Sequence, residues 1–103
     1  MGINVRLEKE NGEPIEWLDE PLPKSLRLHK LPFYESQDFY LAGSIDPIGD
    51  TIFNHLQAAQ LLLEWTKLTA RVEESERKIM TEVARLLLAC RDGLHLYVRF
   101  IGD

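Results

Sequence analysis

The stretch that most constrains the fold covers residues 50–91, which are rich in apolar side chains and contain neither glycine nor proline. At about 100° per residue, the first half carries two apolar stripes on nearly opposite sides of a helix. One stripe holds Ile52, Leu56, Ala59 and Leu63, and the other holds Leu61, Trp65, Leu68 and Val72. A surface helix usually has one apolar arc a little wider than about 100°. We therefore expect a helix capped by Asp50 or Thr51 and covered on two sides, by a sheet and by another helix.

Residues 73–91 have the pattern of an ordinary amphipathic helix. Its apolar face would hold Ile79, Met80, Val83, Leu86, Leu87 and Cys90. One continuous helix over residues 51–91 would be about 60 Å long at about 1.5 Å per residue. This is too long for a compact domain of this size, whose radius of gyration would be about 13 Å. We expect a break between Thr69 and Ser75. The alternative is a long helix that pairs with a second copy of the chain.

Apolar and polar residues alternate on both sides of the helical stretch, which is typical of half-buried strands. The alternation covers residues 3–7, 15–17, 39–44 and 94–101. The sequence therefore predicts an α+β fold, with a largely antiparallel sheet of about four strands and two helices packed on one face. The length fits a single domain over residues 1–103.

The first two strands are joined by a turn at Gly12, and the needs of the core decide their register. A three-residue loop with Gly12 in the left-handed conformation would place Leu7 opposite Ile15. The same loop would place Val5 opposite Trp17 and gather the apolar residues of both strands on one face. The glutamates of this hairpin are typical of a solvated face; they are Glu8, Glu10, Glu13 and Glu16.

The net charge of −5 argues against general nucleic-acid binding and against binding to anionic membranes. It is compatible with a basic protein partner. The single cysteine, Cys90, excludes an intramolecular disulfide, and no segment is apolar enough to span a membrane. The first ten residues lack the apolar run of a signal peptide. We expect a cytoplasmic protein.

The segment from Asp46 to His55 concentrates polar groups, namely Asp46, Asp50, Thr51, Asn54 and His55. One interpretation is a recognition or metal-binding loop at the start of a helix. The other is a turn opened by Asp46 and closed by a helix cap. A calcium loop would need more oxygen ligands at fixed alternate positions than this segment offers.

The last predicted strand places His95, Tyr97 and Arg99 on one face. A face of an antiparallel sheet can stay open to solvent, and Tyr and Arg are enriched in protein interfaces. The histidines, His29, His55 and His95, lie in three different elements and form no zinc motif. The chain also lacks a phosphate-binding glycine loop and a nucleophile elbow.

Three segments resemble a family of short, uncharacterised bacterial proteins: residues 1–8, residues 46–54 with Gln57, and residues 95–103. The resemblance implies no established activity, so it assigns no functional residues. Some small acidic bacterial proteins are immunity proteins that neutralise toxins, an analogy of size and charge.

Our leading hypothesis is a small protein-binding module, immunity-like or regulatory, that acts by surface complementarity. Its surface would combine the following residues: Asp46, Asp50, Asn54, His55, His95, Tyr97 and Arg99. One alternative is an enzyme or metal-dependent binder that assembles dispersed groups such as His55, His95 and Asp50. Another is a homodimer formed through the broad apolar arc of the first helix. No catalytic residue, metal site, cofactor, nucleic-acid partner or membrane partner is predicted.

Overall fold

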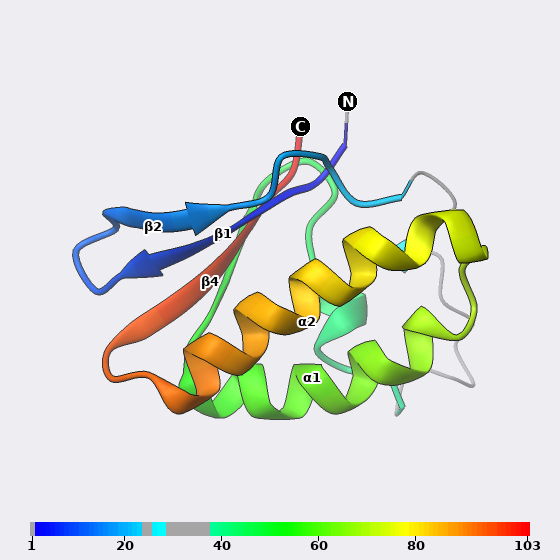
Figure 1. Cartoon of the computed structure of the whole chain (residues 1–103). Helices are drawn as coiled ribbons and strands as arrows, with labels where there is room; N and C mark the ends of the chain where they lie inside the picture. Colours follow the sequence, from blue (N-terminus) through cyan, green and yellow to red (C-terminus); the bar gives the residue numbers. More distant parts are fainter. Residues whose placement is uncertain (1, 24–25, 29–37) are drawn as a thin grey trace.

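The computed structural model of the chain describes residues 2–23, 26–28 and 38–103, so His29 lies outside the described residues. In this part of the chain, four antiparallel strands form one sheet in the order β2-β1-β4-β3, accompanied by two α-helices (Figure 1). The strands are β1 (Asn4–Lys9), β2 (Pro14–Trp17), β3 (Asp50–Phe53) and β4 (Leu96–Ile101). The helices are α1 (His55–Thr69) and α2 (Arg77–Asp92), with short 3-10 helices η3 (Ala42–Ser44) and η4 (Glu74–Glu76). The predicted α+β class is confirmed.

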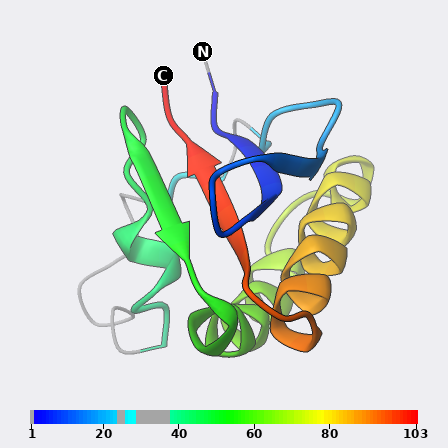
Figure 2. The same ribbon diagram turned by 90° about the vertical axis from the view of Figure 1, so that its left-hand side faces the viewer.

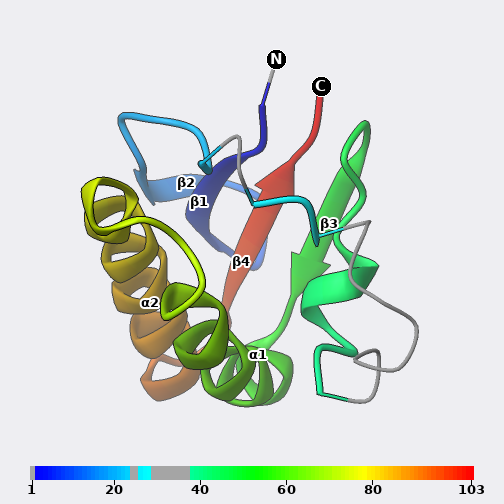
Figure 3. The ribbon, with the colours of Figure 1, turned by 90° about the vertical axis from the view of Figure 1, so that its right-hand side faces the viewer.

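The core lies between the sheet and the helix pair. Figures 1 and 3 show α1 and α2 side by side on the same side of the sheet. Trp65 of α1 is fully buried at the centre, where its ring lies 5.9 Å from that of Phe100 on β4. Its indole N–H donates to the Met80 carbonyl of α2 at 3.0 Å. One side chain therefore joins α1, α2 and the sheet.

The two helices are separate, as the sequence predicts. The first ends at Thr69, and η4 precedes the start of α2 at Arg77. No helix in the described part of the chain has both the length and the apolar character needed to cross a membrane.

The predicted start of the first helix is wrong, because Asp50–Phe53 forms strand β3 (Figure 2). The β-branched and aromatic residues of this segment fit a pleated surface and pair with β4. The helix cap is Asn54, whose Oδ1 accepts a hydrogen bond from the Gln57 backbone N–H at 2.9 Å. The Gln57 side chain accepts one in return from the Asn54 N–H, which completes a capping box.

The expectation that α1 is covered on two sides is also wrong. Its stripe with Leu61, Trp65 and Leu68 is buried, but Leu56 and Leu63 on the other side are 70% and 65% exposed. The sheet and α2 cover one side of the helix, which leaves part of the second stripe open in the single chain.

Residues 39–44 were expected to form a strand, but they form a turn and the 3-10 helix η3. The cause is a contact from far along the chain. Glu64 of α1 is buried, and its carboxylate accepts hydrogen bonds from the backbone N–H groups of Leu41 at 3.3 Å and Ala42 at 2.9 Å. A carboxylate satisfies the free N–H groups at the start of a helical turn, so this segment folds as a turn.

The first hairpin combines the predicted loop with an unpredicted register. Gly12 has a φ of 87°, and the Lys9 N–H donates to the Glu13 carbonyl at 2.8 Å, so the three-residue loop is confirmed. A β-bulge at Ile15 then shifts the pairing by one residue.

As a consequence of the bulge, Leu7 pairs with Glu16 and Arg6 pairs with Trp17, which corrects the predicted pairs of Leu7 with Ile15 and of Val5 with Trp17. The shift turns Glu16 towards the helices, where it accepts hydrogen bonds from Arg85 of α2. The hydrogen bond from Arg85 lowers the pKa of the Glu16 carboxyl. The same shift turns Trp17 to the other side of the sheet.

Candidate functional site

The sheet face opposite the helices carries the candidate site. The pairs Arg6 with Arg99, Glu8 with Tyr97, and Ile52 with Arg99 place these side chains on one face, while Val5, Leu7, Val98 and Phe100 alternate towards the core. We call this surface the open face. Its residues are Arg6, Glu8, Trp17, Asp50, Ile52, Tyr97 and Arg99.

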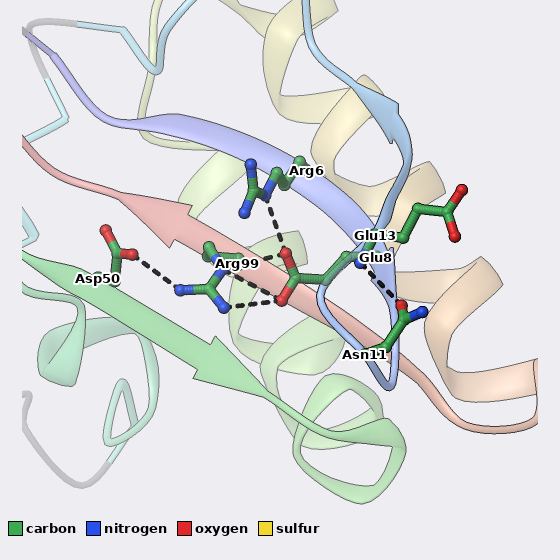
Figure 4. A network of polar contacts seen from close by, with 6 residues as sticks. All are labelled: Arg6, Glu8, Asn11, Glu13, Asp50 and Arg99. Carbon is green, nitrogen blue, oxygen red and sulfur yellow. Dashed lines mark hydrogen bonds and ion pairs between the residues drawn. The ribbon is translucent and has the colours of Figure 1, made fainter.

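A cluster of charged side chains lies at the centre of the open face (Figure 4). Glu8 accepts a hydrogen bond from Arg6 Nε at 2.8 Å, and Arg99 Nε lies 3.0 and 3.1 Å from its two carboxylate oxygens. Arg99 Nη2 is 3.0 Å from Glu8 Oε1, and Arg99 Nη1 donates to Asp50 Oδ2 at 2.8 Å. The cluster therefore links strands β1, β4 and β3.

The position of Glu8 explains how two arginines can share this surface. Arg6 and Arg99 are directly opposite one another on neighbouring strands, where like charges repel. The Glu8 carboxylate bonds to both guanidinium groups and is only 2% exposed, although no helix covers it. Its hydrogen bonds raise the pKa of the Arg99 guanidinium, with a further contribution from Asp50. Both arginines are therefore held in position by contacts within the chain.

The two arginines differ in how many of their guanidinium nitrogens are already bonded within the chain. Arg99 uses Nε, Nη1 and Nη2 to bind Glu8 and Asp50. In the described part of the chain, Arg6 bonds to Glu8 through Nε alone, which leaves its terminal nitrogens without a partner. Arg99 is therefore a structural residue of the face, whereas Arg6 can bind a group from outside.

Apolar side chains stand on either side of the charged cluster. Trp17 on β2 is 62% exposed, and Ile52 on β3 is also exposed. A hollow of about 260 Å³ lies beside Arg6 and Trp17; its described lining residues are Asn4, Val5, Arg6, Trp17, Leu18 and Ile101. The open face therefore offers an aromatic platform, a small hollow and a guanidinium group next to one another.

Of the predicted site residues, Asp50, Tyr97 and Arg99 meet on the open face. Asp46 instead builds the preceding turn, because its Oδ1 accepts from the Ile48 N–H at 2.9 Å and its own N–H donates to Thr51 Oγ1. Asn54 caps α1. For Asp46 and Asn54, the structure therefore favours the interpretation as turn and cap.

The two described histidines lie outside the strands that form the open face. His55 is exposed in the first turn of α1. His95 precedes β4, and its left-handed conformation, with a φ of 57°, separates it from the alternation of Tyr97 and Arg99. The predicted row of His95, Tyr97 and Arg99 on one face is therefore wrong at His95. Among the described residues, no three His, Cys, Asp or Glu side chains form a group that could hold a metal ion.

The sequence reasoning missed Arg6, Glu8 and Trp17. Alternation places Arg6 and Glu8 on the face opposite Val5 and Leu7, which was a usable signal. Glu8 was interpreted as part of a solvated acidic face, yet it is buried by its two arginine partners. Trp17 could not be placed without the bulge at Ile15.

No protein-family model, curated protein or solved structure shows a significant match to this chain.

Proposed function

We propose that this chain is a small protein-binding module that docks a partner on the open face of its sheet, by surface complementarity and without chemistry of its own. The observation that carries the proposal is the exposed Trp17 beside a prearranged arginine and carboxylate cluster. Tryptophan, tyrosine and arginine dominate the energetics of protein interfaces. Action in the cytoplasm, in an immunity-like or regulatory role, is part of the proposal.

The electrostatics of the open face also support docking. A buried charge at an interface is costly unless it is paired. Glu8 and Arg99 already satisfy one another, and Asp50 completes the set. A partner can therefore cover the centre of the face without leaving these charges unpaired, and it gains apolar contact with Trp17 and Ile52.

The test compares the wild-type chain with two matched variants as baits. Trp17→Ser removes the aromatic platform of the open face, and Leu94→Ser removes an apolar side chain that is 82% exposed in the turn before β4. Both side chains are exposed, so both variants should keep the far-ultraviolet circular dichroism of the wild type.

We expect a partner that binds the wild-type chain and the Leu94→Ser variant alike and binds the Trp17→Ser variant at least about tenfold more weakly, as hot-spot truncation costs of ~2 kcal/mol imply. The purified partner should then shift the NMR signals of open-face residues. A partner that binds Trp17→Ser as tightly as the wild type would show that the open face is not the docking surface.

A second candidate function is a homodimer, and the exposed Leu56 and Leu63 on α1 favour it. A second copy of the same stripe would cover these leucines by symmetry. Light scattering of the wild type and of a Leu56→Gln, Leu63→Gln variant tests this candidate. A dimer that the double variant abolishes would support it, and a monomer at high concentration would exclude it.

A further inference from the structure

From the hollow beside Arg6 we infer that the open face recognises a C-terminal carboxylate of a partner chain whose last residue is apolar. This inference rests on the proposed function and names the group that the docking surface would bind. Both Arg6 and Trp17 line the hollow.

The charge of the hollow favours an anionic ligand. The whole chain carries a net charge of −5, yet Arg6 is the one charged residue among the described residues that line the hollow. Its partner Glu8 bonds only to Nε, so the edge formed by the two terminal nitrogens has donors that the described residues do not use. Such an edge binds a carboxylate through two parallel hydrogen bonds.

Preorganisation of Arg6 also favours binding. A free arginine side chain loses rotamer entropy when it binds a ligand. Glu8 holds Arg6 at 2.8 Å and is itself fixed by Arg99, so much of this ordering is complete before binding. A guanidinium fixed at one end and unpaired at the other is suited to a ligand that brings its own negative charge.

Apolar side chains form a wall of the hollow next to the charge of Arg6. Trp17, Leu18 and Ile101 line the same hollow, and its volume of about 260 Å³ is smaller than the roughly 300–1,000 Å³ of small-molecule pockets. A C-terminal residue carries its carboxylate and its side chain on one Cα atom. It can therefore place the carboxylate on Arg6 and an apolar side chain against Trp17 together. An internal acidic side chain brings no apolar group at a fixed short distance.

The experiment titrates the ¹⁵N-labelled full chain with two small probes that share one apolar group. The first probe is N-acetyl-leucine, which has a free carboxylate, and the second is N-acetyl-leucinamide, which has none. We expect saturable shifts of the Arg6 Nε–H and Trp17 Nε1–H signals with the acid, in the millimolar range. N-acetyl-leucinamide should bind about tenfold more weakly than N-acetyl-leucine. Acetate, a third probe that has the carboxylate without the apolar group, should also bind about tenfold more weakly than N-acetyl-leucine.

Three variants test whether N-acetyl-leucine binds at Arg6. Arg6→Gln should abolish the response to the acid, and Arg77→Gln, which changes an exposed arginine at the start of α2, should leave it unchanged. Because Arg6→Gln also disturbs the contact with Glu8, Asn4→Asp provides a second test. It adds a negative charge at the edge of the hollow without touching that contact, and it should weaken binding of the acid about tenfold.

Equal responses to the acid and the amide, or an undiminished response in Arg6→Gln, would overturn the inference. Its failure can be told apart from failure of the proposed function. A partner that needs Trp17 but binds equally well with an amidated C-terminus would overturn the inference and leave the docking surface in place. Loss of binding when the C-terminus of the partner is amidated would support both the inference and the proposed function.

Discussion

Replacing Glu8 with glutamine should lower the free energy of unfolding by about 2–3 kcal/mol. The carboxylate is buried and accepts hydrogen bonds from Arg6 and Arg99. A hydrogen bond to a charged group contributes about 1.5–3 kcal/mol and a neutral one about 0.5–1.5 kcal/mol, so each arginine loses about 1 kcal/mol. The amide also turns an N–H₂ donor towards a guanidinium, which adds up to about 1 kcal/mol.

This estimate is below the roughly 3–5 kcal/mol that breaking a fully buried ion pair costs. The reason is that the side chains of Arg6 and Arg99 are 23% and 20% exposed, so water can replace part of what they lose. Urea unfolding followed by tryptophan fluorescence, in which buried Trp65 reports the loss of the core, measures the change. With a denaturant dependence of about 1–3 kcal/mol per molar urea, the midpoint should fall by about 1–2 M.

The control for this prediction is Glu13→Gln. Glu13 lies in the same hairpin, and its carboxylate is 3.8 Å from Lys9 in an exposed pair, so its replacement should cost no more than about 0.5 kcal/mol. If the Glu8→Gln midpoint stays within about 0.3 M of the Glu13→Gln midpoint, the charged cluster does not stabilise the sheet as the geometry implies.

Three further predictions concern the described contacts outside the open face. Asn54→Ala removes the cap of α1 and should destabilise the chain by about 1 kcal/mol in urea unfolding; an unchanged midpoint would contradict the capping argument. Glu64→Gln weakens the anchor of η3, so hydrogen exchange at the Ala42 amide should become faster while exchange in α2 stays the same. Burial raises the pKa of the Cys90 thiol to about 11, so the thiol stays protonated until the pH rises to that range. At pH 8, native protein should react with iodoacetamide roughly 100-fold more slowly than free cysteine, and equal rates would refute the burial argument.

The sequence predicts those features that depend on local periodicity. Both helices, the break after Thr69 and the strand alternation around Val5 and Val98 follow from the spacing of apolar residues. The start of α1 was misplaced because Ile52 falls on the same apolar stripe as Leu56 and Leu63 at about 100° per residue, although residues 50–53 pair with β4 as a strand.

The features that sequence reasoning missed depend on contacts between distant residues. The turn at residues 38–41 and η3 form around the carboxylate of Glu64, which lies 22 residues beyond Ala42. The charged cluster needs the register of three strands, because Arg6, Arg99 and Asp50 come from separate parts of the sequence. Periodicity gives the face of a side chain but does not give its neighbour on the next strand.

The bulge at Ile15 gives the strongest physical reason to regard the open face as functional. With the predicted register, Trp17 would lie on the same side as Val5 and could bury its ring against the helices. Full burial of a large apolar side chain stabilises a fold by roughly 1.5–3 kcal/mol, and the bulge forgoes most of this by leaving Trp17 62% exposed. The ion pair that it creates between Glu16 and Arg85 is itself exposed and contributes at most about 1 kcal/mol. Bulges often re-aim side chains beside functional sites. Under the proposed function, contact between Trp17 and a partner would be the gain that offsets this loss.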